Sequence, residues 1–224
     1  DKLVSTERLA ALGEMSAKVA HEINNPLGII KNYLHLTLRA LEDNPQARGY
    51  VDVVGQELDR IARIVRELLD FHQPQSPVYE PIDLRKVIDD ILVLMARQFE
   101  SRRIEVTKRY SSDLGPVEAS EENLKQVFLN LFINAIDAMS DGGRLTIGVN
   151  RHNGRVRILV DDTGPGIAPD HIGHIFEPFF TTKELGQGTG LGLSVCYGII
   201  KRHNGTITYN NTDVGGRFTI DLPV

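Results

Sequence analysis

The sequence lacks several features that define whole classes of protein. Cys196 is the only cysteine among 224 residues, which excludes an internal disulfide framework and favours a reducing compartment. No apolar run approaches the roughly 18 residues that span a bilayer, and the N-terminus has no signal-peptide core. The net charge of -5 provides no basic field for nucleic acid or an anionic membrane. We therefore expect a cytoplasmic protein, or the cytoplasmic part of a larger sensor, with no membrane segment in this stretch of sequence and no nucleic-acid partner.

Glycine and proline are unevenly distributed along the chain. Only five of the 20 glycines precede residue 142, and Pro74, Pro77 and Pro81 punctuate a short polar stretch. Because prolines in a polar stretch often mark a boundary between folded units, we predict two domains, residues 1–76 and 77–224. The composition, 41% apolar and 25% charged, is that of an ordinary globular protein.

The first predicted domain has the pattern of an all-α helical hairpin. Between about residues 5 and 73, apolar residues recur every three or four positions in two stretches, each of which forms an apolar stripe along a predicted helix. In the first stretch the spacing shifts by one residue at Pro26, where the helix should kink. The connector at 42–45 supplies turn chemistry. One hairpin cannot cover both apolar stripes, whereas two chains can pair into a four-helix bundle. The packing requirement therefore predicts a homodimer.

The second predicted domain mixes two periodicities. Helical spacing of apolar residues covers 83–99, 120–140 and about 191–204, and strand-like runs cover 104–110, 144–150, 155–162, 205–210 and 216–222. The Asn153-Gly154 pair between two of these runs is typical of a tight hairpin turn. The pattern predicts an α+β sandwich, with helices packed on a mostly antiparallel sheet.

The first candidate for chemistry is a histidine on the predicted hairpin. Heptad spacing places His21 on the outer face of the bundle, where Glu22 could accept its proton if the imidazole acts as a nucleophile. Asn25 lies one helical turn further along the same face. A solvated surface histidine is the commoner explanation of such a position when it is considered alone.

A second candidate is a polar stripe on an otherwise apolar helix. Asn130, Asn134 and Asp137 are spaced i, i+4, i+7 within residues 127–139, which are apolar nearly all round and are therefore predicted to be buried. A buried stripe of amides and a carboxylate needs partners. A ligand with Mg²⁺ would satisfy it, since oxygen donors suit that ion, and an internal polar network is the alternative.

A third candidate is a strand that ends in a glycine turn. Strand alternation puts Asp162 at the end of an apolar row that faces the core, and Gly164 and Gly166 follow it. These glycines would let a flat ring approach the backbone, and the carboxylate could accept a hydrogen bond from the exocyclic amine of an adenine. An ordinary strand-to-loop turn is the commoner explanation of this motif by itself.

A fourth candidate is the glycine-rich segment 186–192, which runs directly into an apolar helix. Its free backbone N–H groups and the helix N-terminus can cradle phosphates. The stretch before it is long for a plain connection, which suggests a mobile lid. Lys183 in that stretch could reach a terminal phosphate as a point charge.

Together and in this order, the four candidates and the stretch between the third and the fourth closely resemble the catalytic core of two-component sensor histidine kinases of the nitrogen-regulator type. They correspond to that family's phosphoacceptor box (His21 to Leu27), N box (Asn130 to Ala138), first glycine box (Asp162 to Gly166), F box (Phe176, Phe179) and second glycine box (Gly186 to Gly192). The resemblance implies a dimeric four-helix bundle followed by an α/β-sandwich ATP-binding domain of the Bergerat (GHKL) type.

The resemblance also implies a reaction. ATP would phosphorylate His21 with Glu22 as the base, and the phosphoryl group would pass to an Asp of a response-regulator receiver domain. Asn25 fits the family's reverse, phosphatase activity, and Asn130 and Asn134 would bind Mg²⁺. The residues implied to bind the nucleotide are Asn130, Asn134, Asp137, Asp162, Gly164, Gly166, Thr181, Thr182, Lys183, Gly186, Gly188, Thr189, Gly190, Leu191 and Gly192.

Two alternatives use the same nucleotide fold. Type II topoisomerases, mismatch-repair ATPases and heat-shock chaperones share it, but they carry Glu at the position of Asn130, whose amide cannot act as a base. A dimeric scaffold that binds nucleotide without phosphotransfer is the other alternative. Of the remaining residues, His171 and His174 are expected on the lid surface and Cys196 in the core.

Overall fold

The chain divides into two compact units, Asp1–Gln75 and Ser76–Val224. A computed structural model describes residues 78–183 and 190–224, together with 27–34, 49–55 and the single positions 37, 44, 46, 58 and 61. In the first unit, residues 27–34 and 49–55 are helical, as the apolar spacing predicts. The predicted kink at Pro26 and the prolines at 74 and 77 lie outside the described residues.

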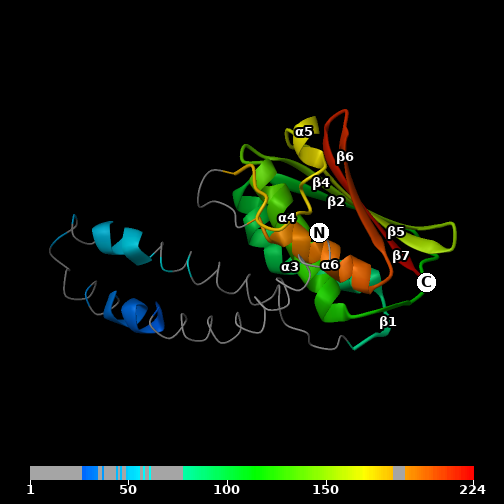
Figure 1. The fold of residues 1–224 in the computed structure, drawn as a ribbon, viewed down its shortest axis with the longest axis horizontal. Coiled ribbons are helices and arrows are strands. Elements are labelled where there is room, and N and C mark those ends of the chain that lie inside the picture. Colours follow the sequence, from blue (N-terminus) through cyan, green and yellow to red (C-terminus); the bar gives the residue numbers. More distant parts are fainter. Residues whose placement is uncertain are drawn as a thin grey trace, which may run out of the picture. The chain divides into compact units, whose positions relative to one another are not determined.

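A five-stranded sheet forms one layer of the second unit (Figure 1). Its strands, in spatial order, are β2 (Ile104–Tyr110), β4 (Gly143–His152), β5 (Arg155–Asp162), β7 (Gly215–Pro223) and β6 (Thr206–Thr212). β2 is parallel to β4, and the other neighbouring pairs are antiparallel. The prediction of a mostly antiparallel sheet is therefore confirmed.

The turn between β4 and β5 is the two-residue hairpin that the sequence predicts. His152 pairs with Arg155 across it, and Asn153 and Gly154 have φ angles of 50° and 71°. Positive φ at both central residues is the requirement of a type I′ turn, which Asn-Gly satisfies at low cost. The turn fixes the register of β5 and hence the position of Asp162 at its far end.

Three helices cover one face of this sheet (Figure 1). They are α3 (Leu84–Ser101), α4 (Glu121–Ala138) and α6 (Gly192–Arg202). The side chains of Asp83 and Ser120 cap α3 and α4 by accepting backbone N–H bonds from Arg85 and Asn123, which satisfies donors that a helix start leaves unpaired. The helices and the sheet enclose an apolar core, so the predicted α+β sandwich is confirmed.

Three short elements were not predicted. β1 (Glu80–Ile82) and β3 (Val117–Ala119) pair as a separate two-stranded antiparallel sheet, and α5 (Pro169–Ile172) is a single helical turn after β5. Elements of three or four residues are too short to display a period of 2.0 or 3.6, so apolar spacing could not reveal them.

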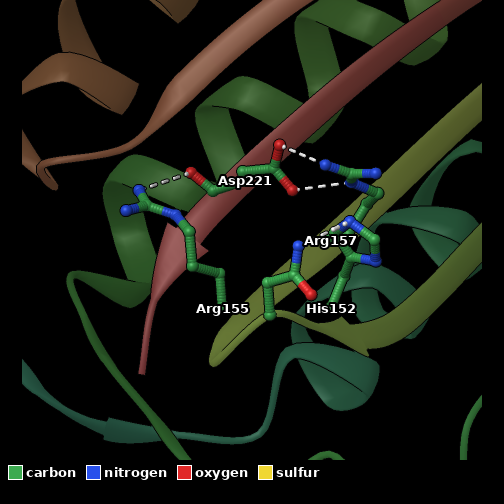
Figure 2. Close-up of polar contacts among 5 residues, drawn as sticks. His152, Arg155, Arg157 and Asp221 are labelled. Carbon is green, nitrogen blue, oxygen red and sulfur yellow. Dashed lines mark hydrogen bonds and ion pairs between the residues drawn. The ribbon is translucent and has the colours of Figure 1, made fainter.

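The two faces of the sheet differ in chemistry. On β5, Val156, Ile158 and Val160 are buried against the helices. The opposite face carries two bidentate ion pairs between β5 and β7. Figure 2 shows one, with Arg157 Nε and Nη2 donating to the Asp221 carboxylate at 2.7 and 3.0 Å. Cross-strand pairs of this kind help to hold the register of the strands.

The second outer-face pair lies next to Asp162. Arg217 Nε and Nη2 donate to the carboxylate of Asp161 at 2.6 and 2.7 Å, and in the same ladder Asp162 faces Gly216. In the described part of the chain, no helix is both long and apolar enough to cross a bilayer.

Candidate functional site

The polar stripe of α4 lies on a side of the helix that the core leaves partly open. Asn130 and Asn134 are half-buried, Asp137 is exposed, and Ile133 beside them is 40% exposed. The prediction that the stripe is buried is therefore wrong for Asp137 and holds only in part for Asn130 and Asn134. Apolar composition does not show which side of a helix lacks a neighbour, and here α3, α6 and the sheet leave one side uncovered. The stripe spans about 10 Å along the helix axis.

One end of the stripe meets the start of α6. Asn130 donates from Nδ2 to the carbonyl oxygen of Gly192 at 3.3 Å. Nearby, the Cys196 thiol is fully buried, donates to the carbonyl of Val127 at 3.7 Å, and has its pKa raised to about 12 by burial. The prediction that Cys196 lies in the core is confirmed, and Asn130 is fixed beside the N-terminus of α6.

The other end of the stripe meets the turn that follows β5. A Cβ atom on Gly164 would lie 2.9 Å from Cβ of Ala138, at the end of α4, and 2.8 Å from Oδ1 of Asp162. No side chain fits at such distances, so the turn approaches the helix this closely only because residue 164 is glycine.

Asp162 is a buried carboxylate with few partners. It is 8% exposed and lies on the core side of β5, as strand alternation predicts. Gly164 donates its N–H to Oδ1 at 2.8 Å. Burial raises the pKa of Asp162, although the N–H groups of Gly164 and Gly216 act in the opposite direction. A carboxylate held in this way has capacity to accept a further hydrogen bond.

Two further residues of this region were not among the site residues predicted from the sequence. Tyr209 and Asn211 come from β6, and Asn211 exchanges two hydrogen bonds with the backbone of Ile167, directly after Gly166. Strand alternation places Tyr209 and Asn211 on the same face of β6. The sequence does not show, however, that β6 lies beside this turn.

Lys183 contacts the polar stripe directly. Its Nζ atom lies 2.5 Å from Oδ2 of Asp137, and its backbone N–H donates to the hydroxyl of Thr181 at 3.1 Å. Thr181 and Thr182 are exposed. The lysine that was predicted to approach a phosphate is therefore held at the Asp137 end of the stripe.

The segment before Lys183 is also joined to the residue that precedes Leu191. Phe179 donates its N–H to the carbonyl of Gly190 at 3.0 Å. A Cβ atom on Gly190, whose φ is +69°, would come within 2.7 Å of the carbonyl oxygens of Phe179 and Phe180. Gly190 therefore holds Phe179 and Phe180 close to the residues that precede α6.

The described site residues thus form one arrangement along α4. Asn130, Asn134 and Asp137 run along the helix, Gly164 and Asp162 adjoin one end, Gly192 adjoins the other, and Lys183 pairs with Asp137. The predicted residues His21, Glu22, Asn25, Gly186, Gly188 and Thr189 lie outside the described residues.

His171 and His174 are exposed on and just after α5. His174 Nδ1 lies 3.0 Å from Oε1 of Glu177, and both imidazole rings contact the ring of Phe180. Among the residues that the structure describes, no group of three or more His, Cys, Asp or Glu side chains is placed to hold a metal ion.

Two protein families match the chain. Residues 11–77 match the His Kinase A (phospho-acceptor) domain. Residues 119–224, which include α4, the Asp162 turn and α6, match the histidine kinase-, DNA gyrase B-, and HSP90-like ATPase family.

Curated relatives extend the match over the whole chain. The chain is 37% identical over 225 residues to the sensor histidine kinase ZraS of Escherichia coli (strain K12), covering 100% of this chain and 48% of that protein. It is 38% identical over 223 residues to sporulation kinase A of Bacillus subtilis (strain 168), covering 99% of this chain and 36% of that protein. The chain therefore spans about half or less of the length of these relatives.

Solved structures give the same result. The catalytic domain of histidine kinase ThkA is 35% identical, with a TM-score of 0.61, and covers 65% of this chain and 95% of that one. ThkA in complex with response regulator protein TrrA is 33% identical, with a TM-score of 0.72 over 97% of this chain and 63% of that one. Full-length ShkA in complex with AMPPNP is 28% identical, with a TM-score of 0.80 over 94% of this chain and 46% of that one.

Proposed function

The chain belongs to the histidine kinases, and we propose that it transfers the γ-phosphoryl group of ATP to its own His21 and then to an aspartate of a response-regulator receiver domain. The observation that carries this proposal is the arrangement along α4. A buried carboxylate lies at one end of a half-open polar stripe, and a helix N-terminus lies at the other. Such an arrangement suits a ligand with a base at one end and phosphates at the other.

Asp162 is the residue that we propose to recognise the adenine base. Its carboxylate accepts hydrogen bonds and is poorly solvated, so an N–H donor from the exocyclic amine would be a strong, charge-assisted partner. Gly164 and Gly166 give the turn beside Asp162 its shape, because a Cβ atom on Gly164 would lie 2.9 Å from Cβ of Ala138 and one on Gly166 would lie 2.5 Å from Oδ1 of Asn211. The complex of the related ShkA with AMPPNP supports a nucleotide at this fold.

Asn130 and Asn134 are the proposed ligands of Mg²⁺. Their amide oxygens are hard donors that suit this ion. Since the described residues offer no cluster of carboxylates or imidazoles for a metal, the ion would take its remaining ligands from phosphates and water. When bound, it would neutralise phosphate charge during transfer.

The phosphates are proposed to lie at the start of α6, beside Asn130, where Lys183 would reach them after leaving Asp137. The backbone of Gly186, Gly188, Thr189, Gly190, Leu191 and Gly192 would donate N–H groups to them. Lys183 would exchange its contact with Asp137 for one with the terminal phosphate, and Thr181 and Thr182 flank it. These residues position and neutralise the phosphates rather than form bonds, which is what phosphoryl transfer requires.

The chemical step itself is proposed for His21 and Glu22. A ring nitrogen of His21 attacks the γ-phosphorus, the bond from that phosphorus to the bridging oxygen breaks, and ADP leaves with the electron pair. Glu22 accepts the proton that the imidazole loses. Asn25, four residues after His21 in the sequence, is proposed to orient water in the reverse, phosphatase reaction. The match of residues 11–77 to the phospho-acceptor domain supports these roles.

We also propose that the active form is a homodimer, with residues 1–76 as the dimerisation and phosphotransfer domain and 77–224 as the ATP-binding domain. In the described part of the first unit, several apolar positions of the two predicted stripes are exposed. They include Ile30 at 44%, Val54 at 47% and Ile61 at 41%. Pairing of two hairpins into a four-helix bundle would bury them. The complex of ThkA with TrrA supports a receiver domain as the second partner.

The chemistry of the labelled product tests this function against its alternatives. The chain is incubated with γ-labelled ATP and Mg²⁺, and the protein is then treated with acid or alkali. A phosphohistidine is lost in acid and survives alkali, so this stability profile supports the kinase. Release of labelled inorganic phosphate without labelled protein would favour a water-directed ATPase. Nucleotide binding without either product would favour the dimeric scaffold.

A further inference from the structure

One side chain of β6 supplies both hydrogen bonds to the backbone of a residue in the Asp162 turn. Oδ1 of Asn211 accepts the N–H of Ile167 at 2.9 Å, and Nδ2 of Asn211 donates to the carbonyl oxygen of Ile167 at 2.7 Å. The side-chain amide therefore pairs with Ile167 as a neighbouring peptide group would. Because the two residues are 44 positions apart, the bond pair attaches the turn to the sheet.

Tyr209 adds a third hydrogen bond to this amide. Its hydroxyl donates to Oδ1 of Asn211 at 2.9 Å, so that oxygen accepts two hydrogen bonds. A flipped amide is excluded by Ile167, because it would set an N–H group against the Ile167 N–H and an oxygen against the Ile167 carbonyl. The Tyr209 ring is itself 6% exposed and packs on Phe218 with ring centroids 4.9 Å apart.

The same tyrosine adjoins Asp162. A Cβ atom on Gly216 would lie 2.7 Å from the Tyr209 hydroxyl and 2.9 Å from Oδ2 of Asp162, so both groups approach one glycine. Burial and the nearby Asp162 charge raise the pKa of Tyr209, although the backbone of Ile167 acts in the opposite direction.

The turn is shaped around Asn211. Gly166 has a φ of +72°, and a Cβ atom there would lie 2.5 Å from Oδ1 of Asn211. Two glycines in a short turn would otherwise allow it many conformations, and a ligand that binds only one of them would lose binding free energy in ordering the turn. If the side chains of Tyr209 and Asn211, together called the clamp, order the turn before the ligand binds, this loss is avoided.

We propose that Tyr209 and Asn211 are positioning residues for the nucleotide: they hold the turn from Gly164 to Ile167 in place beside Asp162 and thereby raise the affinity for ATP. The inference rests on the proposed function, because it takes Asp162 as the group that meets the base. Neither residue is proposed to touch the phosphates or His21, so the clamp acts on binding and leaves the transfer step unchanged.

The affinity test compares Asn211→Ala and Tyr209→Phe with Asn210→Ala as a matched control. Asn210 precedes Asn211 on the same strand, and its exposed side chain lies on the opposite face of the sheet. We expect the Kd for AMPPNP with Mg²⁺, measured by calorimetry, to rise about tenfold in Asn211→Ala and severalfold in Tyr209→Phe. It should stay unchanged in the control. The KM for ATP should rise in parallel while kcat for self-phosphorylation is kept.

A second readout needs no nucleotide. The exchange rate of the Ile167 amide proton, measured by NMR in the free protein, should rise at least tenfold in Asn211→Ala and stay unchanged in Asn210→Ala. Unchanged exchange would overturn the clamp whether or not ATP binds. Faster exchange with an unchanged Kd, or equal losses in kcat and affinity, would overturn its role in nucleotide binding.

Failure of the function itself gives a different pattern. A wild-type chain that binds no AMPPNP and takes up no label would refute the proposed function and, with it, the role of the clamp in affinity. If Asn211→Ala does not fold, Tyr209→Phe decides the matter alone, since it removes one oxygen atom and keeps the ring that packs on Phe218. An unaltered Kd in that variant would then overturn the inference.

Discussion

Lys183 and Asp137 form an ion pair in which Nζ of the lysine lies 2.5 Å from Oδ2 of the carboxylate. The pair joins the segment that ends at Lys183 to the polar stripe of α4, and both side chains are about a third exposed. In the proposed function Lys183 must leave Asp137 to reach the terminal phosphate, so the ion pair competes with the nucleotide.

This competition predicts opposite effects of two substitutions on nucleotide affinity. Lys183→Ala should weaken binding of ATP with Mg²⁺ because a phosphate contact is lost. Asp137→Asn should strengthen it about two- to fivefold, the range expected for an exposed ion pair. Calorimetry on the two single variants and the double variant measures the coupling. Asp141→Asn, an exposed acid just after α4, is the control for a general change in charge.

The double variant decides the mechanism of the Asp137 effect. If Asp137 acts by holding Lys183, Asp137→Asn should have no effect when Lys183 is alanine. An equal gain in both backgrounds would mean that the carboxylate acts on the phosphates directly, and the competition would be refuted.

Gly164 is predicted to be indispensable for binding. In Gly164→Ala the new methyl group would lie 2.8–3.0 Å from Asp162 Oδ1, Ala138 Cβ and the Ala138 carbonyl oxygen, so the turn must move away from α4. We expect the Kd for AMPPNP, measured by calorimetry, to rise at least tenfold. Gly173→Ala is the control, because a Cβ atom there meets nothing within 4 Å. Equal affinities in the two variants would contradict the assigned position of the turn.

Asp162 is predicted to recognise the amino group of the base. ATP and purine riboside triphosphate, which lacks that amine, are compared by calorimetry on wild type and on Asp162→Asn. The wild type should prefer ATP by about tenfold or more, the contribution of a hydrogen bond to a charged group. The variant should lose most of this preference. A preference that survives the substitution would mean that another group contacts the amine.

His203 makes the stability of the second unit dependent on pH. The ring is buried, its Nε2 accepts the N–H of Ser120 at 3.0 Å, and its Nδ1 donates to the carbonyl of Ile199 at 2.8 Å. Burial lowers the pKa of His203 from its ordinary value of 6.5, so below pH 6.5 the unfolded chain takes up the proton more readily. The contribution of the neutral ring is therefore complete above pH 6.5. It is lost as the pH falls from 6.5 through the lowered folded-state pKa.

The measurement for His203 is the thermal unfolding midpoint between pH 5 and 7.5. The wild type should lose stability on acidification through this window, and His203→Gln should be less stable at pH 7.5 with a weaker dependence on pH. His171→Gln, which removes an exposed ring, should follow the wild type. If the pH dependence of His203→Gln equals that of the wild type, the conclusion that His203 stabilises the fold in its uncharged form is wrong.

The sequence predicted the long elements of the second unit because their apolar periods are long enough to count. The register of β5 followed from the Asn153-Gly154 turn, and the buried side of Asp162 followed from strand alternation. The open side of α4 was missed, since an apolar sequence does not show where neighbouring helices stop.

Contacts between distant residues could not be predicted from spacing. Lys183 and Asp137 are 46 positions apart, and the pairing of Asn211 with Ile167 depends on how β6 is placed in the sheet. Both involve ordinary polar residues, whose partners are set by tertiary structure alone.

Labelling of His21→Gln is the sharpest test of phosphoryl transfer to His21. The wild-type chain and this variant are incubated with γ-labelled ATP and Mg²⁺, and AMPPNP binding to each is measured in parallel. We expect the variant to bind the nucleotide as the wild type does but to incorporate no acid-labile, alkali-stable phosphate. Incorporation of such label at the wild-type level by His21→Gln would mean that another residue accepts the phosphoryl group.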